Sequence, residues 1–214
     1  MPYPPPLVIA SRNRAKAGEM VEILQGYGVA VSTLADYPEA MAADEPDEVG
    51  CTYAENAEIK ARAAFELTGR VCVADDAGLE IDALDGQPGV YSRRFLGEET
   101  TFPDKMTRLL AMLRDVPEER RGCRFVSVVA IATPDGRVLY CHGVCEGRVA
   151  HAMRGQNGFG YDPVFYLPAL GRHMAELTPA EKHAISHRGK ALACAVPIIR
   201  ELLGQTGEMG ARLP

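Results

Sequence analysis

Two adjacent carboxylates, Asp75 and Asp76, directly follow the apolar run at 71–74, which is typical of a buried strand. In an extended backbone their side chains point to opposite faces, and like charges this close repel unless a cation lies nearby. We expect the strand to end here, with a turn at Gly78, so that both carboxylates lie at its carboxyl end, where α/β proteins bind ligands. Together with Glu48 from the preceding loop, they offer the oxygen ligands that Mg²⁺ prefers. The alternative is an Asx turn without a ligand.

Ser11, Asn13 and Lys16 form a second group, where a short apolar run at 7–10 turns into a helix. A helix N-terminus presents unpaired N–H groups and a partial positive charge, which suit a phosphate. Lys16 adds a mobile charge and Ser11 adds a hydroxyl. The glycines of a Walker A loop are missing, and the alternative is a capped surface helix.

Phe159 lies between two glycines in the segment NGFGYDP at 157–163. Glycine permits backbone conformations that other residues rarely adopt, and an aromatic ring held on such a loop stacks well on a nucleobase. Gly160, Tyr161 and Asp162 continue the segment as candidate contacts to the same ligand. The alternative is a tight loop whose Phe159 packs in the core.

Lys182, His187 and Arg188 gather several hydrogen-bond donors around a helix break at Ser186. Such donors match the O6 acceptor of hypoxanthine, xanthine or guanine, and they match the amino group of adenine poorly. The alternative is a solvated basic helix end.

Six cysteines are present and include no CxxC pair. Most of them lie in apolar segments, which favours a role as small buried side chains. A zinc site that uses Cys141, His142 and Cys145 is the less favoured interpretation, because four ligands at the usual spacing are not visible.

The elements that must position these groups follow from periodicity, capping boxes and turn residues. We expect helices from 13 to 27, from 52 to 68, from 101, from 178 and from 186, strands at 7–10, 29–34, 71–74 and 79–84, and an antiparallel hairpin of 124–133 and 138–149. A strand–helix–strand start followed by a hairpin predicts an α/β fold with a mixed sheet.

The chain has 214 residues, 47% of them apolar, and a formal net charge of -6. The acidic balance does not favour long nucleic acid as a partner. No segment has the length of a membrane helix and the start does not look like a signal peptide, so we expect a cytoplasmic protein. We expect a flexible Pro-rich arm at 1–6, one domain of two lobes at 7–203 and a flexible tail at 204–214.

Seven segments resemble the inosine/xanthosine triphosphate pyrophosphatase family, in order and at matching spacing. They are SRN at 11–13 with Lys16 and Glu19, TYAENA at 52–57 with Lys60 and Ala61, ADDAGL at 74–79, GQPGVYS at 86–92, GFGYDP at 158–163, AELTPAEK at 175–182 and SHRG at 186–189. The likeness runs from about Val8 to Leu203. It implies an elongated mixed β-sheet with flanking helices, two lobes around a central substrate cleft, a homodimer, and hydrolysis between the α and β phosphates of non-standard purine triphosphates (ITP, dITP, XTP).

The resemblance also implies roles for individual residues. Asp76 is the expected catalytic carboxylate, and Glu48 and Asp76 are the expected ligands of Mg²⁺. The expected substrate contacts are Ser11, Asn13, Lys16, Ala77, Phe159, Gly160, Tyr161, Asp162, Lys182, His187 and Arg188. Ala77 departs from the family, which usually has serine there, so a hydroxyl contact is lost although a backbone N–H contact remains.

Two other functions stay open at this point. One is a pyrophosphatase for modified pyrimidine or methylated nucleotides, which a panel of bases separates from the first. The other is a nucleotide-binding sensor without catalysis. Asp75, Asp76 and Glu48 argue against the sensor, because a sensor does not need metal-binding carboxylates.

Overall fold

The structure is a computed structural model that describes residues 7–204, so the expectations for the arm at 1–6 and for the tail at 204–214, apart from Gly204, lie outside it. Its centre is a seven-stranded sheet in the order β2-β1-β3-β4-β5-β6-β7. The strands are β1 Leu7–Ile9, β2 Val31–Thr33, β3 Cys72–Ile81, β4 Gly122–Ala132, β5 Val138–Val149, β6 Phe165–Leu167 and β7 Arg172–His173. The pairs of β1 with β2 and β3 are parallel and the other pairs are antiparallel, which confirms a mixed α/β sheet.

Six α-helices surround this sheet within the described residues. They are α1 Arg14–Gly26, α2 Pro38–Ala42, α3 Tyr53–Thr68, α4 Phe102–Met112, α5 Pro179–Ile185 and α6 His187–Leu202. The predicted helix starts are confirmed: Asn13 caps α1, Thr52 and Glu55 form a capping box at α3, and Thr178 and Ser186 cap α5 and α6. No helix among residues 7–204 has the length and apolar character needed to cross a membrane.

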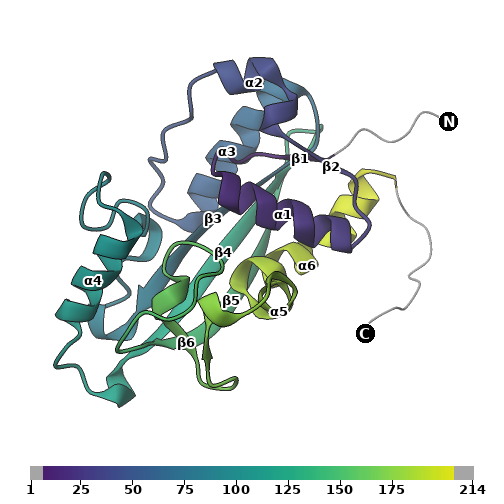
Figure 1. The fold of residues 1–214 in the computed structure, drawn as a ribbon. Coiled ribbons are helices and arrows are strands. Elements are labelled where there is room, and N and C mark those ends of the chain that lie inside the picture. The colour runs from purple at the N-terminus through teal and green to yellow at the C-terminus, as the bar shows by residue number, and fades with distance from the viewer. Residues whose placement is uncertain (1–6, 205–214) are drawn as a thin grey trace.

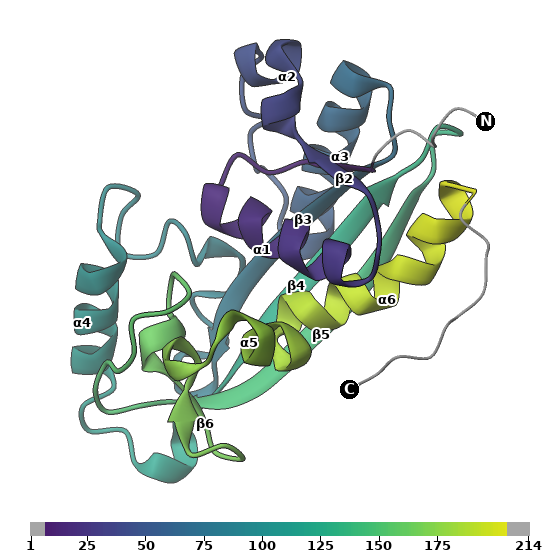
Figure 2. The same cartoon turned by 45° about the vertical axis from the view of Figure 1, so that its right-hand side comes forward.

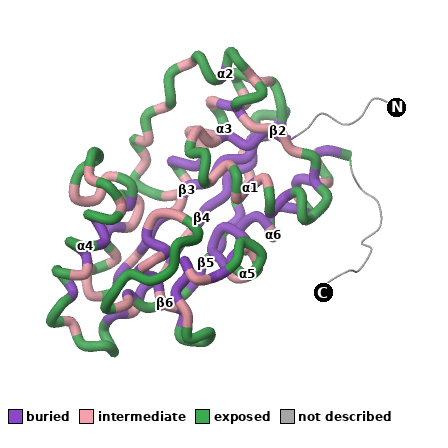
Figure 3. The backbone as a smooth tube through the Cα atoms, in the orientation of Figure 1, coloured by how far each residue is buried: buried purple, intermediate pink, exposed green. Residues whose placement is uncertain are grey.

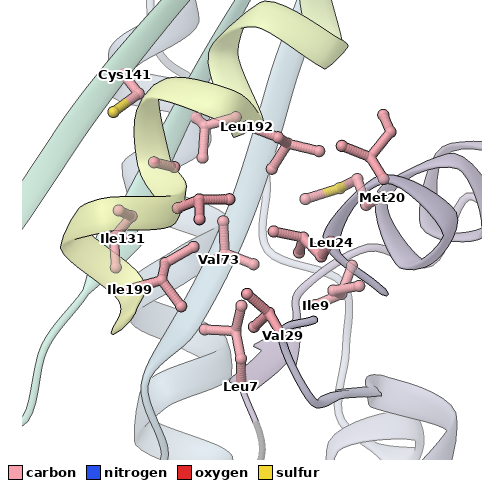
Figure 4. Packing of buried hydrophobic residues seen from close by; sticks show 14 of the residues in the cluster. Leu7, Ile9, Met20, Leu24, Val29, Val73, Ile131, Cys141, Leu192 and Ile199 are labelled. Carbon is pink, nitrogen blue, oxygen red and sulfur yellow. The ribbon is translucent and has the colours of Figure 1, made fainter. Parts of the chain in front are cut away.

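Alternate residues of the central strands pack against different helices. Leu7, Ile9 and Val73 pack against α1 and α6, which lie side by side in Figures 1 and 2. Figure 4 shows this cluster from close by. Val8 and Ala74 point the other way, against the small side chains of α3. Both faces of the central strands are therefore largely buried, and much of their length is purple in Figure 3.

The expected end of the strand at Asp75 is wrong. β3 continues through both aspartates to Ile81 and pairs with β4 along its full length, from Cys72↔Ala132 to Ile81↔Cys123. The short return strand expected at 79–84 is therefore the end of β3 followed by a 3₁₀ turn. Because side chains alternate along a strand, Asp75 shares the α1 and α6 face with Val73, whereas Asp76 shares the α3 face with Ala74.

The predicted hairpin is confirmed as β4 and β5, which are paired from Gly122↔Arg148 to Ala132↔Val138. Cys141 and Cys145 point into the protein from β5, whereas His142 between them is exposed on the other side. The zinc interpretation fails on this geometry, since the three side chains do not converge. Residues 7–204 contain no cluster of three His, Cys, Asp or Glu side chains suited to a metal.

Candidate active site

One pocket gathers every site residue predicted from the sequence. It encloses about 1390 Å³, the open mouth included. The predicted residues that line it are Ser11, Asn13, Lys16, Glu48, Asp76, Ala77, Phe159, Gly160, Tyr161, Asp162, Lys182, His187 and Arg188. The fold therefore brings segments from both ends of the chain to one place.

On the α3 side of the pocket, Lys60 joins the two carboxylates that were predicted to hold a metal. Its Nζ donates to Glu48 Oε1 at 2.9 Å and to Asp76 Oδ1 at 3.1 Å. One turn earlier on α3, the buried Asn56 places its Nδ2 3.5 Å from Asp76 Oδ2, and its Oδ1 accepts a hydrogen bond from the Gly50 N–H at 2.8 Å. α3 thus holds both the strand carboxylate and the loop that carries Glu48.

The pKa values on this side reflect burial and the shared ammonium group. Burial raises the pKa of Asp76, and the charges of Lys60 and Lys16 offset only part of that rise. Burial alone would lower the pKa of Lys60, but the charges of Asp76 and Glu48 outweigh it and raise that pKa. The two carboxylates therefore converge on a position that already accommodates a positive charge.

On the opposite face of β3, Asp75 binds cations from two helices. Its Oδ2 accepts hydrogen bonds from Arg188 Nη2 at 2.8 Å and Nε at 3.2 Å, and it lies 3.4 Å from Lys16 Nζ. Its Oδ1 accepts a hydrogen bond from the Ser127 hydroxyl. Burial alone would raise the pKa of Asp75, but the charges of Arg188 and Lys16 hold it well below its usual range. Asp75 is therefore an ionised carboxylate.

Two further carboxylates hold the cations at the far end of the pocket. Glu19 in α1 accepts hydrogen bonds from Arg188 Nη1 at 2.6 Å and from Lys182 Nζ at 2.5 Å. Asp162 Oδ2 accepts a second hydrogen bond from Lys182 Nζ at 2.7 Å. A guanidinium has five N–H donors and an ammonium three, so Arg188 keeps two donors and Lys182 keeps one for a ligand.

Phe159 is half-buried above these cations, so the interpretation of this residue as a core side chain is wrong. Its ring centroid lies 4.9 Å from Lys182 Nζ and 5.5 Å from Arg188 Cζ. Its backbone N–H donates to Asp162 Oδ2 at 2.9 Å. Gly158 has a φ of 73°, and a Cβ at that position would overlap the Asp162 carboxylate. Glycine is therefore required at position 158 for the loop to close around the Asp162 carboxylate.

His187 forms the floor of the pocket at this end. Its ring stacks on Phe125 with centroids 4.7 Å apart, and Phe125 stacks in turn on Phe165 at 4.4 Å. Its Nδ1 is buried without a hydrogen-bond partner in the described residues. Burial, together with the charge of Arg188, lowers the pKa of His187 well below its ordinary value. The imidazole is therefore neutral and packs as an aromatic ring beneath the pocket.

Gly143 on β5 allows the start of α6 to approach the sheet, since a Cβ there would overlap the His187 carbonyl. This contact sets the height of His187 and Arg188 above the strands. Sequence patterns do not reveal such an approach, because the two residues lie far apart in the chain.

The predicted phosphate group lies where β1 leads into α1. Asn13 Oδ1 accepts hydrogen bonds from the N–H groups of Ala15 at 3.0 Å and Lys16 at 3.1 Å, so this oxygen serves the helix cap. The Ser11 hydroxyl donates to the Asn13 carbonyl at 3.4 Å. Burial lowers the pKa of Lys16 and the charge of Asp75 opposes it. The ammonium of Lys16 lies inside the pocket, on the Asp75 side.

Tyr161 has a structural contact within the base-side segment. Its hydroxyl donates to the Ser92 carbonyl at 3.0 Å, and its ring meets Phe102 edge to face at 5.3 Å. Gly160 has a φ of 67° and lines the pocket, as does Ala77 on β3. Tyr161 thus anchors the loop that carries Phe159.

Lys60, Glu19 and Asn56 are pocket-side residues that sequence reasoning did not assign to the site. A signal was available for two of them: Asn56 and Lys60 are polar residues four positions apart on a helix face that otherwise carries alanines. Glu19 lies three positions after Lys16 on α1. In each case the helical spacing is visible in the sequence, but the residue that the side chain contacts in another part of the fold is not.

Comparisons with known proteins identify relatives that match most of this chain. The Ham1 family matches residues 7–198. The dITP/XTP pyrophosphatase of Desulforamulus reducens is 45% identical over 196 residues, which cover 92% of this chain and 96% of that protein. The solved HAM1 protein from Coxiella burnetii has a TM-score of 0.79 at 40% identity and covers 91% of this chain and 98% of its own. The dITP/XTP pyrophosphatase structure from Mycobacterium abscessus has a TM-score of 0.70 at 45% identity and covers 90% of this chain and 100% of its own. The chain belongs to the Ham1 family.

Proposed function

We propose that this protein hydrolyses dITP, ITP and XTP between the α and β phosphates, giving the nucleoside monophosphate and pyrophosphate. The observation that carries this proposal is the division of one pocket into two chemically different ends. Carboxylates, lysines and a helix N-terminus gather at one end, and an aromatic ring above two cations held by carboxylates lies at the other. The relatives named as dITP/XTP pyrophosphatases support the choice of substrate.

The carboxylate oxygens at the first end of the pocket are suitable ligands for a divalent cation. Glu48 and Asp76 both contact the Lys60 ammonium, so their oxygens converge around one positive charge. These two carboxylates would hold Mg²⁺, with phosphate oxygens and water as the remaining ligands. When bound, Mg²⁺ supplies charge neutralisation on the phosphates.

Asp76 is the proposed general base for the attacking water. The carboxylate of Asp76 is buried and lines the pocket, where it can accept a proton from a water molecule beside the phosphates. The Lys16 ammonium at the start of α1 is the proposed phosphate contact, with Ser11 and Asn13 beside it. Fixed donors of this kind stabilise the charge that develops in the transition state.

The base is read at the second end of the pocket. Phe159 stacks on the purine, while the remaining donors of Lys182 and Arg188 face its edge and His187 lies beside them. A 6-oxo group pairs with such donors, whereas the 6-amino group of adenine leaves them unpaired, which costs on the order of 1 to 3 kcal/mol for each buried donor. Gly160, Tyr161, Asp162 and Ala77 shape the walls of the site.

We further propose the assembly and setting that the family resemblance implies. Residues 7–203 form one elongated domain of two lobes with the substrate cleft between them, and the protein works as a cytoplasmic homodimer. Size-exclusion chromatography with light scattering tests the dimer.

Pyrophosphate release with Mg²⁺ from ITP, dITP, XTP, ATP, GTP, CTP, UTP and a set of modified pyrimidine and methylated nucleotides tests the function. We expect strong release from the first three. Equal release from all would refute the base-reading geometry, and preferred release from a modified pyrimidine or methylated nucleotide would favour that related activity. Nucleotide binding without release would favour a sensor.

A further inference from the structure

Asp75 Oδ2 contacts cations that belong to the two ends of the pocket. Arg188, at the start of α6, donates Nη2 at 2.8 Å and Nε at 3.2 Å, and Lys16 in α1 lies 3.4 Å away. The side chain of Asp75 is 1% exposed and that of Arg188 is 2% exposed, so water does not substitute for this contact. One oxygen atom therefore sets the separation between the base-end guanidinium and the phosphate-end ammonium.

The contact with Arg188 is also directional. Asp75 binds the Nε edge of the guanidinium, and Glu19 binds Nη1 on the other side at 2.6 Å. Two carboxylates on different edges fix the plane of a guanidinium, whereas one leaves it free to pivot. The directions of the two unused N–H groups of Arg188 therefore depend on Asp75.

We propose that Asp75 is a positioning residue for base selectivity. It holds the Arg188 guanidinium at a fixed distance from Lys16 and in a fixed orientation, so that the free N–H donors of Arg188 meet a 6-oxo purine. This inference rests on the proposed function, because it needs a purine at the Arg188 end of the pocket. Donors held in fixed directions pair with O6 and stay unpaired beside a 6-amino group. Donors free to turn find other acceptors, and the distinction is lost.

The test compares kcat/KM for ITP and for ATP in the wild-type protein and in Asp75→Asn. Hydrogen bonds to charged groups carry enough free energy for an expected fall of about 10- to 100-fold in the ITP/ATP ratio. Asp75→Glu keeps the charge and should recover part of the ratio. Asp82→Asn is the matched control, since Asp82 also pairs with an arginine, Arg124, at 2.9 Å, but outside the pocket. An unchanged ratio in Asp75→Asn would overturn the inference.

A second comparison covers the case in which Asp75→Asn does not fold, because it leaves Arg188 and Lys16 short of a counterion. Arg188→Gln and the double variant Asp75→Asn/Arg188→Gln remove the charge of Arg188 as well. If Asp75 acts through Arg188, the two variants have the same ITP/ATP ratio, and a further drop in the double variant would overturn the inference. Absence of pyrophosphate release by the wild type would instead refute the proposed function itself.

Discussion

Replacing Lys60 by methionine removes the ammonium group between Glu48 and Asp76 and keeps most of the apolar stem. The ammonium lies 2.9 Å from Glu48 Oε1 and 3.1 Å from Asp76 Oδ1. The side chains of Glu48 and Asp76 are 24% and 8% exposed. In the variant the two carboxylates face each other with no cation between them, and the folded state is destabilised.

The expected loss follows from this burial. Removing one partner of a buried ion pair costs about 3 to 5 kcal/mol, and the partial hydration of Glu48 places the value near the lower limit, about 3 kcal/mol. In a protein of this length each kcal/mol changes Tm by about 2 to 4 °C. We therefore expect the Tm of Lys60→Met to fall by about 6 to 12 °C in the presence of EDTA.

Thermal unfolding with and without Mg²⁺ measures the loss of Tm and tests whether a missing positive charge between Glu48 and Asp76 causes it. Mg²⁺ should raise the Tm of Lys60→Met more than that of the wild type, because the wild-type ammonium already occupies the position between the carboxylates. Arg62→Met is the matched control, since Arg62 pairs with Glu58 at 2.7 Å on the exposed side of the same helix. If Lys60→Met had the same Tm as the wild type in EDTA and the same response to Mg²⁺, this reasoning would be refuted.

Three further predictions concern other pocket residues. Asp76→Asn should lose on the order of 10² to 10⁴ in kcat, and near-normal turnover would remove it as the base. Lys182→Met should lower the ratio of kcat/KM for ITP to kcat/KM for ATP on the order of 10- to 100-fold, and an unchanged ratio would exclude Lys182 from base reading. The lowered pKa of His187 means that below about pH 6.5 the unfolded chain binds a proton that the folded chain does not. The free energy of unfolding should thus decline with falling pH, by at most about 1.4 kcal/mol per pH unit from this group. Urea titrations should show a shallower decline in His187→Phe and the wild-type decline in the exposed control His142→Gln, and parallel curves for all three would contradict the shift.

Local sequence signals determined most of the helix starts in this protein. The Asn13 cap, the capping box of Thr52 and Glu55, and the Thr178 cap each depend on residues two or three positions apart. The hairpin of β4 and β5 likewise follows from two strand-like runs around a Pro-Asp-Gly turn. These elements could be predicted because all the groups that stabilise them lie within one segment.

The path of β3 was decided by tertiary structure. A pair of aspartates followed by a glycine favours a turn, but ten consecutive pairs with β4, together with cations from other elements, keep this segment extended. Tertiary pairing can override the local preference for a turn. The free-energy cost of burying a carboxylate depends on its charged partners, which here come from other elements. Those partners, Lys60 for Asp76 and Arg188 for Asp75, are not visible in the local sequence.

The sequence by itself determined the types of the functional groups and their order, and it predicted that Asp75 and Asp76 point to opposite faces if the backbone stays extended through them. Only the tertiary structure decided which charges meet them there. Lys60 reaches Asp76 from α3 at 3.1 Å, and Arg188 reaches Asp75 from α6 at 2.8 Å. The physical reason is that alternation along a strand is a local property of the backbone, whereas the distance between two charges depends on how separate helices pack on the two faces of the sheet.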